Sequence, residues 1–127
     1  MRAAVVLMLP WLALLLADGC RSTEHIPQEP ARAIFYEFYS KTCPHCKAME
    51  PVVAQFEKEH GKRFSQFVRI LYQSDEGREL FRKYGITGTP TFLIETDDGK
   101  EIDRVSGEMS LEALITFADS CLKRLNK

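Results

Sequence analysis

Residues 33–46 read AIFYEFYSKTCPHC, an apolar run that leads into two cysteines three residues apart. The first seven residues are mostly β-branched or aromatic, which predicts a buried strand. Over residues 44–60, apolar side chains recur every three or four positions, which predicts a helix that begins beside Cys43 and carries Cys46 in its first turn. Two cysteines at this spacing can open and close a disulfide, form half of a zinc site, or pack as small buried side chains. Redox chemistry is the leading hypothesis.

The N-terminus has the features of a secretory leader. Residues 1–17 begin with Met-Arg and continue as an apolar run, which is shorter than the roughly 20 residues that span a bilayer. We expect residues 1–19 to be a signal peptide of the lipoprotein type, residues 20–32 to form a tether, and residues 33–127 to form the working domain. This domain would lie outside the cytoplasm, where disulfides persist.

The segment that ends in Ala17-Asp18-Gly19-Cys20 resembles a bacterial lipobox, whose cysteine is lipidated and becomes the acylated N-terminus. Gly19 and Cys20 match, whereas Ala17 stands where leucine is expected and Asp18 replaces a small residue. The resemblance implies a lipid on Cys20 and a position at the periplasmic face of a bacterial membrane. The alternatives are cleavage to a soluble secreted or periplasmic protein and an uncleaved anchor.

The composition is that of an ordinary globular domain. Without residues 1–19, the chain keeps 108 of its 127 residues, enough for one domain with a hydrophobic core. Hydrophobic residues make up 45% and charged residues 28%, and the formal net charge of -1 includes no strongly basic or acidic block. This balance argues against nucleic acid or an anionic membrane surface as a partner.

The remainder of the chain predicts three further strands and two further helices. The strands are expected at residues 67–72, 91–95 and 101–105, and the helices at 74–84 and 111–125. Asp97-Asp98-Gly99 is a hairpin signal, Ser110 can cap the last helix, and Cys121 lies on that helix's apolar stripe and is expected in the core. The element order predicts an α/β fold with a mixed four-stranded sheet and helices on both faces.

Taken together, these residues resemble the thioredoxin family over almost all of the mature chain. The matching stretches, in the family's order and spacing, are FYEF at 35–38, CPHCK at 43–47, Pro51, and KYGITGTPT at 83–91. The resemblance implies a thioredoxin fold in which Pro90 follows a cis peptide bond and lies against the disulfide. It also implies that the backbone of Thr89 offers hydrogen bonds to a substrate.

The chain departs from the family pattern in four places. The first strand and helix of thioredoxin are missing or shortened to residues 21–32, and no helical domain interrupts the chain between Cys46 and Pro90. Glu37 stands where thioredoxin has a buried aspartate and where disulfide isomerases and the Dsb-type oxidant have glutamate. Leu71 replaces the lysine that neighbours this acid in thioredoxin, so we expect Glu37 in a drier site than its counterpart.

The expected chemistry follows from the thiolate being the nucleophile. Unpaired N–H groups at a helix start stabilise negative charge by up to about 2 kcal/mol, so Cys43 is the candidate attacking sulfur and Cys46 the resolving one. Pro44 and His45 modulate the site, because a protonated histidine stabilises the thiolate and makes the disulfide easier to reduce. Glu37 is the candidate proton carrier for Cys46.

Each of these roles has a plainer alternative. Glu37 could be a strand residue whose carboxylate reaches solvent, and His45 could be plain surface. The two cysteines could form a permanent disulfide or half of a structural zinc site. The sequence has no second Cys or His pair with ligand spacing, so we expect neither a metal nor another cofactor.

The sequence therefore predicts a thiol-disulfide oxidoreductase that acts on extracytoplasmic protein thiols and disulfides through a mixed disulfide at Cys43, resolved by Cys46. A reductase or general interchange role, recharged by a membrane redox partner, is favoured because the domain is small and tethered. One alternative is a Dsb-type thiol oxidant, which the Pro44-His45 dipeptide favours. Another is a non-catalytic binding or chaperone module that uses the Thr89-Pro90 groove.

Overall fold

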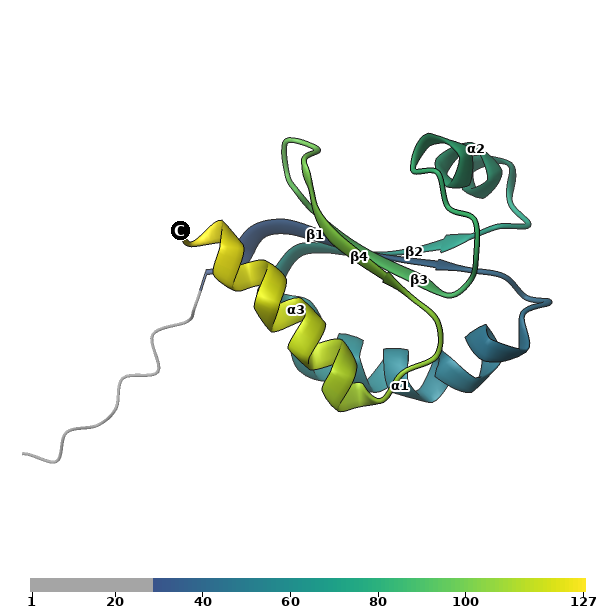
Figure 1. Ribbon diagram of the computed structural model, residues 1–127, viewed down its shortest axis with the longest axis horizontal. Coiled ribbons are helices and arrows are strands. Elements are labelled where there is room, and N and C mark those ends of the chain that lie inside the picture. Colours follow the sequence, from purple (N-terminus) through teal and green to yellow (C-terminus); the bar gives the residue numbers. More distant parts are fainter. Residues whose placement is uncertain (1–28) are drawn as a thin grey trace, which may run out of the picture.

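The computed structural model describes residues 29–127, so the expected leader and Cys20 lie outside the described residues. In chain order, the elements are β1 (Ala31–Tyr39), α1 (Pro44–His60), a 3₁₀ turn (Gly61–Arg63), β2 (Phe64–Leu71), α2 (Asp75–Lys83), β3 (Thr91–Thr96), β4 (Glu101–Ser106) and α3 (Leu111–Leu125) (Figure 1). This is the order that the sequence predicts. Across residues 29–127, no helix has both the length and the apolar character needed to cross a membrane.

The four strands form one mixed sheet in the order β2-β1-β3-β4. β1 pairs in parallel with β2 and antiparallel with β3, and β3 pairs antiparallel with β4. A parallel pair needs a crossover connection, which α1 supplies, whereas a short turn joins β3 to β4. The expected α/β fold with a mixed four-stranded sheet is confirmed. β1 is the first element in the described part of the chain, and residues 21–28, to which the first strand and helix were expected to be shortened if present, lie outside it.

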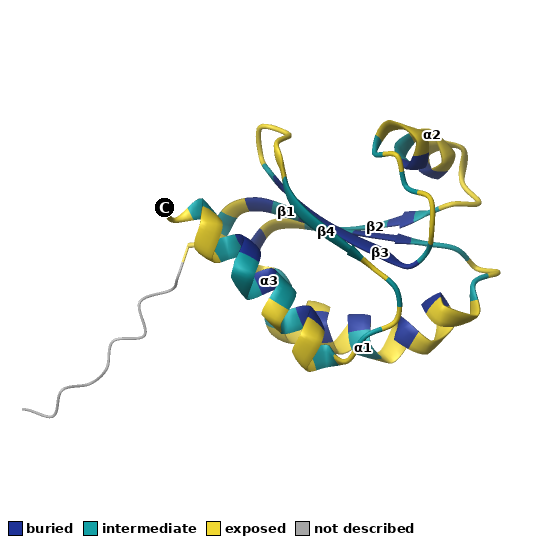
Figure 2. Cartoon of the chain, in the orientation of Figure 1, coloured by how far each residue is buried: buried dark blue, intermediate teal, exposed yellow. Residues whose placement is uncertain are grey.

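Helices cover both faces of the sheet, as expected (Figure 1). α1 and α3 lie on one face, where Phe35 and Leu114 belong to the larger buried cluster. α2 lies on the other face, over a smaller cluster that includes Phe38 and Phe81. Figure 2 shows the buried positions gathered on the central strands and on the inner sides of the helices. Because side chains alternate along a strand, Glu37 points to the same face as Phe35, toward α1.

Two strand boundaries differ from those expected. β1 begins at Ala31, two residues earlier than expected, because Ala31 pairs with Phe64 in the ladder between β1 and β2. β2 spans Phe64–Leu71 and not residues 67–72. The exposed polar residues Ser65 and Gln66 follow Phe64 at the start of this strand, and they interrupt the apolar pattern that marks a buried strand.

Three smaller expectations were tested by the structure. Ser110 caps α3, since its Oγ accepts a hydrogen bond from the Ala113 N–H at 3.1 Å. Cys121 is fully buried in the same cluster as the α1 residues, as expected. The position of His60 at the end of the predicted helix indicates an exposed side chain, and this is wrong: His60 is half-buried, and its ring stacks on Phe56 with 5.3 Å between centroids.

Candidate active site

Cys43 is the N-cap residue of α1, at the point where the chain turns after β1. Its backbone is extended, with φ -92° and ψ 113°, and its Sγ accepts a hydrogen bond from the backbone N–H of Cys46 at 3.2 Å. Pro44 begins the helix, where its missing N–H leaves no hydrogen bond unmade. Cys43 is partly exposed, whereas Cys46 is buried with 2% of its surface accessible. An incoming disulfide therefore meets Cys43 first.

The loop before β3 brings the Thr89-Pro90 peptide against Cys43. The Cys43 thiol donates a hydrogen bond to the carbonyl oxygen of Thr89 at 3.4 Å, although the two residues are 46 positions apart. The Thr89-Pro90 bond is cis, and Pro90 is fully buried. The Pro90 carbonyl accepts a hydrogen bond from the Gly107 N–H at 2.9 Å, which ties the loop to the end of β4. The fold thus assembles the two motifs that the sequence singled out.

The pKa values of the two thiols are shifted in opposite directions. Burial raises the pKa of Cys43, but hydrogen bonds from Cys46 and from the backbone of His45 outweigh it, so that the pKa of Cys43 is lowered. Burial raises the pKa of Cys46, and the hydrogen bond with the Cys43 thiol adds to the effect. The thiolate therefore forms at a lower pH on the accessible sulfur than on the enclosed one.

His45 lies at the rim of the site, where an acidic residue holds its ring. The Nδ1 atom of His45 lies 2.9 Å from Oε2 of Glu108, a residue between β4 and α3. This contact raises the pKa of His45, with a smaller contribution from the charge of Cys43. Sequence reasoning missed Glu108, because it follows His45 by 63 positions and only the fold brings the two together.

Glu37 is enclosed between the sheet and α1. Its side chain is 1% exposed, so the expectation that its carboxylate reaches solvent is wrong and the buried interpretation is confirmed. Oε2 forms an ion pair with Nε of Arg69, while Oε1 has no hydrogen-bond partner in the structure. Burial raises the pKa of Glu37, and Arg69 acts in the opposite direction. Such a carboxyl group exchanges protons at a higher pH than an exposed one does.

Arg69 corrects one inference from the sequence. We expected a drier site for Glu37 because Leu71 stands where thioredoxin has its lysine. The structure supplies a cation from two residues earlier, since the parallel register sets Arg69 directly opposite Glu37. A lone arginine in the apolar run FVRIL was the available signal, and the register needed to interpret it cannot be read from the sequence.

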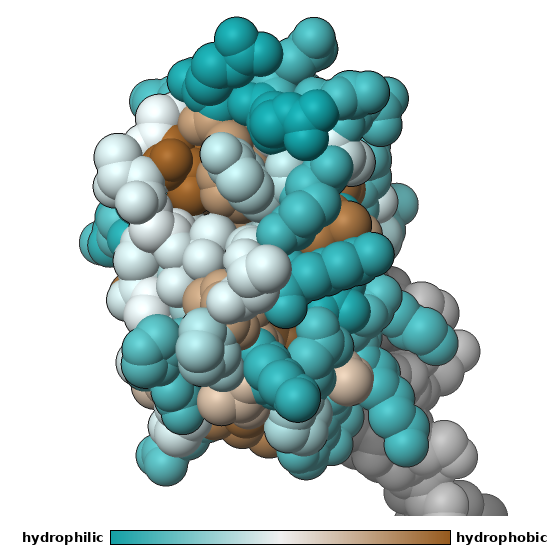
Figure 3. All heavy atoms as spheres, turned by 90° about the vertical axis from the view of Figure 1, so that its right-hand side faces the viewer, coloured by the Kyte–Doolittle hydropathy of each residue, from teal (hydrophilic) through white to brown (hydrophobic). Residues whose placement is uncertain are grey.

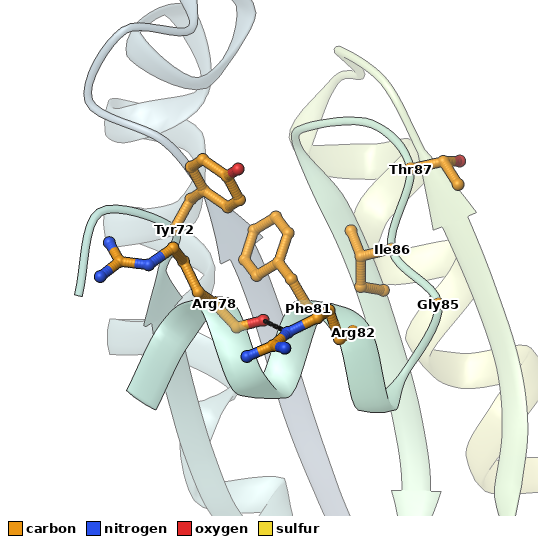
Figure 4. A pocket seen from close by; sticks show the side chains of 7 residues that line it. All are labelled: Tyr72, Arg78, Phe81, Arg82, Gly85, Ile86 and Thr87. Carbon is orange, nitrogen blue, oxygen red and sulfur yellow. Dashed lines mark hydrogen bonds between the residues drawn. The ribbon is translucent and has the colours of Figure 1, made fainter. Parts of the chain in front are cut away.

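A hollow of about 580 Å³ lies next to the site, on the α2 side. Figure 4 shows Tyr72 and Phe81 beside it, with Ile86 and Thr87 on the loop after α2. Tyr72 is 47% exposed, and its N–H bonds to the carbonyl of Tyr39 at the end of β1. Figure 3 faces this end of the molecule, where apolar and pale surface gathers between hydrophilic rims. Thr87, which lines the hollow, is two residues before Thr89, so the same loop contributes to the hollow and to the site.

A model of the family described as thioredoxin matches residues 22–120 of this chain. The chain belongs to the thioredoxin family. Solved structures of family members agree with the fold described above. Fasciola hepatica thioredoxin is 30% identical and superimposes with a TM-score of 0.59, over 72% of this chain and 83% of that one. A thioredoxin from Nicotiana alata is 29% identical, with a TM-score of 0.60, over 70% of this chain and 72% of that one.

The curated relatives of this thioredoxin-family chain include disulfide isomerases and thioredoxins. Protein disulfide isomerase-like 2-2 from Oryza sativa subsp. japonica is 30% identical over 93% of this chain, which spans 34% of that protein. Thioredoxin H-type from Oryza sativa subsp. indica is 32% identical over 63% of this chain and 62% of that protein. The chain thus spans between 17% and 62% of the length of such relatives.

Metal binding was an alternative use of the two cysteines. Among residues 29–127, no group of three or more His, Cys, Asp or Glu side chains is placed to hold a metal ion. The described part of the chain therefore offers Cys43 and Cys46 no further ligands for a structural zinc site, which needs four.

We expect a Glu108→Gln variant to lower the pKa of His45 toward the ordinary histidine value. The carboxylate of Glu108 favours the protonated ring, so the ion pair holds below the pKa of His45 and is lost as the pH rises through it. A pH titration of the His45 ring by NMR measures the change. Glu112→Gln removes a nearby exposed carboxylate that does not contact His45 and should leave the titration unchanged. Equal titration curves for Glu108→Gln and the unaltered protein would contradict the assignment.

Proposed function

We propose that this thioredoxin-family protein is an enzyme that catalyses thiol-disulfide exchange with protein substrates. The observation that carries the proposal is the pair of sulfurs: a partly exposed Cys43 whose pKa is lowered, and a buried Cys46 whose pKa is raised. Both lie against the Thr89-Pro90 peptide. Membership of the family, and relatives named as disulfide isomerases and thioredoxins, support the same chemistry.

The reaction has two displacement steps in the reducing direction. The Cys43 thiolate attacks one sulfur of a substrate disulfide, which forms the mixed disulfide and releases the other substrate sulfur as a thiolate that takes up a proton. Cys46 then loses its proton and attacks Sγ of Cys43. The intramolecular disulfide forms, the second substrate thiol leaves, and two electrons have passed from the protein to the substrate. The oxidising direction is the reverse of these steps.

The buried Glu37 is the proton acceptor that we assign to Cys46 in the second step. A thiol with a raised pKa is a poor nucleophile until it loses its proton, and burial denies Cys46 ready access to solvent. Glu37 lies on the face of β1 that α1 covers, and its free Oε1 can take up a proton. The raised pKa of the carboxyl group makes it a stronger proton acceptor than an exposed glutamate.

Polypeptides are the substrates that the surface beside Cys43 suits best. Tyr72 is 47% exposed and packs on Phe81 with 5.1 Å between ring centroids, so it offers an apolar contact on the surface of the hollow that also includes Thr87. Faster exchange with a protein disulfide such as those of insulin than with oxidised glutathione would support a protein substrate, and equal rates would count against it.

For the direction of electron flow we propose reduction or general interchange, with recharging by a membrane redox partner. The small size of the domain and the relatives named as disulfide isomerases support interchange. The alternative is a Dsb-type oxidant, which the raised pKa of His45 supports.

The deciding measurement is the equilibrium reduction potential of the Cys43-Cys46 pair in a glutathione series. We expect a value between that of thioredoxin, about -270 mV, and that of disulfide isomerase, about -180 mV. A value near -120 mV, that of a strong oxidant, would overturn the assigned direction. Failure of the unaltered protein to speed insulin reduction by dithiothreitol would overturn the enzymatic proposal itself.

We further propose that the protein works outside the cytoplasm, anchored by a lipid on Cys20. The leader-like composition of residues 1–19 and the partial lipobox support this location. Labelling with a radioactive fatty acid tests it: label should enter the unaltered protein and not a Cys20→Ala variant, which should leave the membrane fraction. Equal labelling of both proteins, or recovery of the unaltered protein in the cytoplasm, would contradict the anchor.

A further inference from the structure

Arg69 does more than neutralise the buried acid, because it joins that acid to the protein surface. Its Nε pairs with Oε2 of Glu37, and its Nη2 donates to Oε1 of Glu50 at 2.8 Å. The side chain of Glu37 is 1% exposed, that of Arg69 30% and that of Glu50 48%. Two carboxylates of very different exposure therefore share one guanidinium.

The position of this bridge is fixed by three elements. The guanidinium carbon of Arg69 lies 4.8 Å from the ring centroid of Tyr39, so the arginine is held over an aromatic face as well as by its two acids. Glu50 is four residues after Cys46 on α1, which places it one helical turn from the resolving thiol. The bridge thus runs from solvent, past α1, to the carboxyl group that serves Cys46.

We propose that Arg69 and Glu50 are positioning residues that set, from the protein surface, how readily Glu37 accepts the proton of Cys46. The inference rests on the proposed function, in which Glu37 serves as that acceptor. Arg69 stabilises the ionised form of Glu37 by direct pairing. Glu50 opposes it twice, since it competes for the same guanidinium and adds a negative charge nearby.

The surroundings of Glu37 contain few other ionisable groups. From α1 the charges of Glu50 and Glu57 act on it, and from β2 that of Arg69; from β3 its register partner is Phe92, which carries no charge. The carboxyls of Glu50 and Glu57 both raise the pKa of Glu37, and Glu50 has the larger effect. Only Glu50 also touches Arg69, so it alone acts on Glu37 through the bridge as well as by its charge.

The bridge affects a defined proton transfer. Cys46 Sγ gives up its proton, and Glu37 takes it at Oε1. The resulting thiolate attacks Sγ of Cys43, the bond from Cys43 to the substrate sulfur breaks, and the substrate leaves as a thiolate. Glu37 must be ionised to accept the proton, so the rate of this step should rise with pH through the pKa of Glu37. A higher pKa moves the rise to higher pH, and a lower pKa moves it to lower pH.

Opposite charge changes at the bridge test the proposal. Glu50→Gln should lower the pKa of Glu37 and move the inflection of the resolution rate to lower pH. Arg69→Gln should raise the pKa and move the inflection to higher pH. The matched control is Glu59→Gln, which removes an α1 carboxylate that bonds Gln55 and does not contact Arg69; it should move neither quantity appreciably.

The readout is a carboxyl carbon NMR titration of Glu37 in the reduced protein, alongside the pH profile of resolution. Opposed shifts in the two variants support the bridge, because a merely structural disturbance has no reason to change sign. Shifts in the same direction, or no shift with Glu50→Gln, overturn it. Glu50 is half exposed, so Glu50→Gln carries the test even if Arg69→Gln fails to fold. The titration needs no substrate, so loss of the proposed exchange activity and loss of the bridge are distinguishable.

Discussion

A Cys46→Ala variant will accumulate as a covalent complex with its protein substrates and will complete no second turnover. Cys43 keeps its place at the start of α1, its extended backbone and its approach to Thr89, so it still attacks a disulfide. The sulfur that releases the product is missing, so the mixed disulfide persists until an outside thiol reaches it. Gel electrophoresis without reductant should show the complex, and added dithiothreitol should reduce the mixed disulfide and separate the two proteins.

Two further variants make the trapping result specific. Cys43→Ser should form no covalent complex and should lower insulin reduction to the rate of dithiothreitol alone. Cys121→Ala should behave as the unaltered protein, because Cys121 is fully buried in the core and its pKa is raised by that burial. Partners that resist reductant, or that bind equally well to a protein lacking both Cys43 and Cys46, would identify a binding module in place of an enzyme.

Replacement of Gly77 by alanine will destabilise the fold by about 3 kcal/mol or more. A Cβ at position 77 would lie 1.7 Å from the carbonyl oxygen of Leu71 and 2.6 Å from Oγ of Ser74. These atoms cannot both withdraw, since Ser74 caps α2 through the Gly77 N–H at 2.9 Å and also bonds to the Leu71 carbonyl. Denaturant unfolding of the purified variant measures the loss.

Gly61→Ala is the matched control for this substitution. Gly61 has an ordinary helical backbone, with φ -56° and ψ -36°, and an added Cβ would meet its nearest neighbour, a Glu57 methylene, at 3.5 Å. Its free energy of unfolding should change by less than about 1 kcal/mol, in the stabilising direction. Equal effects at positions 61 and 77 would show that the close approach of α2 to β2 is not rigid.

The parts of the fold that depend on local pattern were predictable. The buried run at 33–39 and the helical spacing after Cys43 are properties of neighbouring residues, and they located β1 and α1 to within two residues. The placement of Pro90 against Cys43 depended on the family resemblance, because no local signal joins residues so far apart. The sequence predicts a shorter second strand than the one that begins at Phe64, because the two residues after Phe64 are polar and exposed.

The contacts that tune the site were not predictable. Arg69 depends on the register of a parallel pair, and Glu108 depends on where the segment after β4 passes His45. The apolar and aromatic run at 33–39 indicates only core packing for Tyr36, yet this residue is half-buried and its hydroxyl donates to Glu95 at 2.8 Å. Tyr84 donates to the same carboxylate oxygen at 2.8 Å. Each of these pairs joins residues from different elements of the fold. The spacing of hydrophobic residues along the chain does not indicate which elements lie next to each other.

The hydrogen bond from Cys43 to the Thr89 carbonyl couples two events at the mouth of the site. A thiol can donate to that oxygen at 3.4 Å, whereas a thiolate or a disulfide sulfur has no proton to give. Ionisation of Cys43 therefore generates the nucleophile and, at the same time, removes the proton that the Thr89 carbonyl accepts. The pH at which Cys43 becomes reactive is thus also the pH at which this backbone carbonyl loses its hydrogen bond to the sulfur.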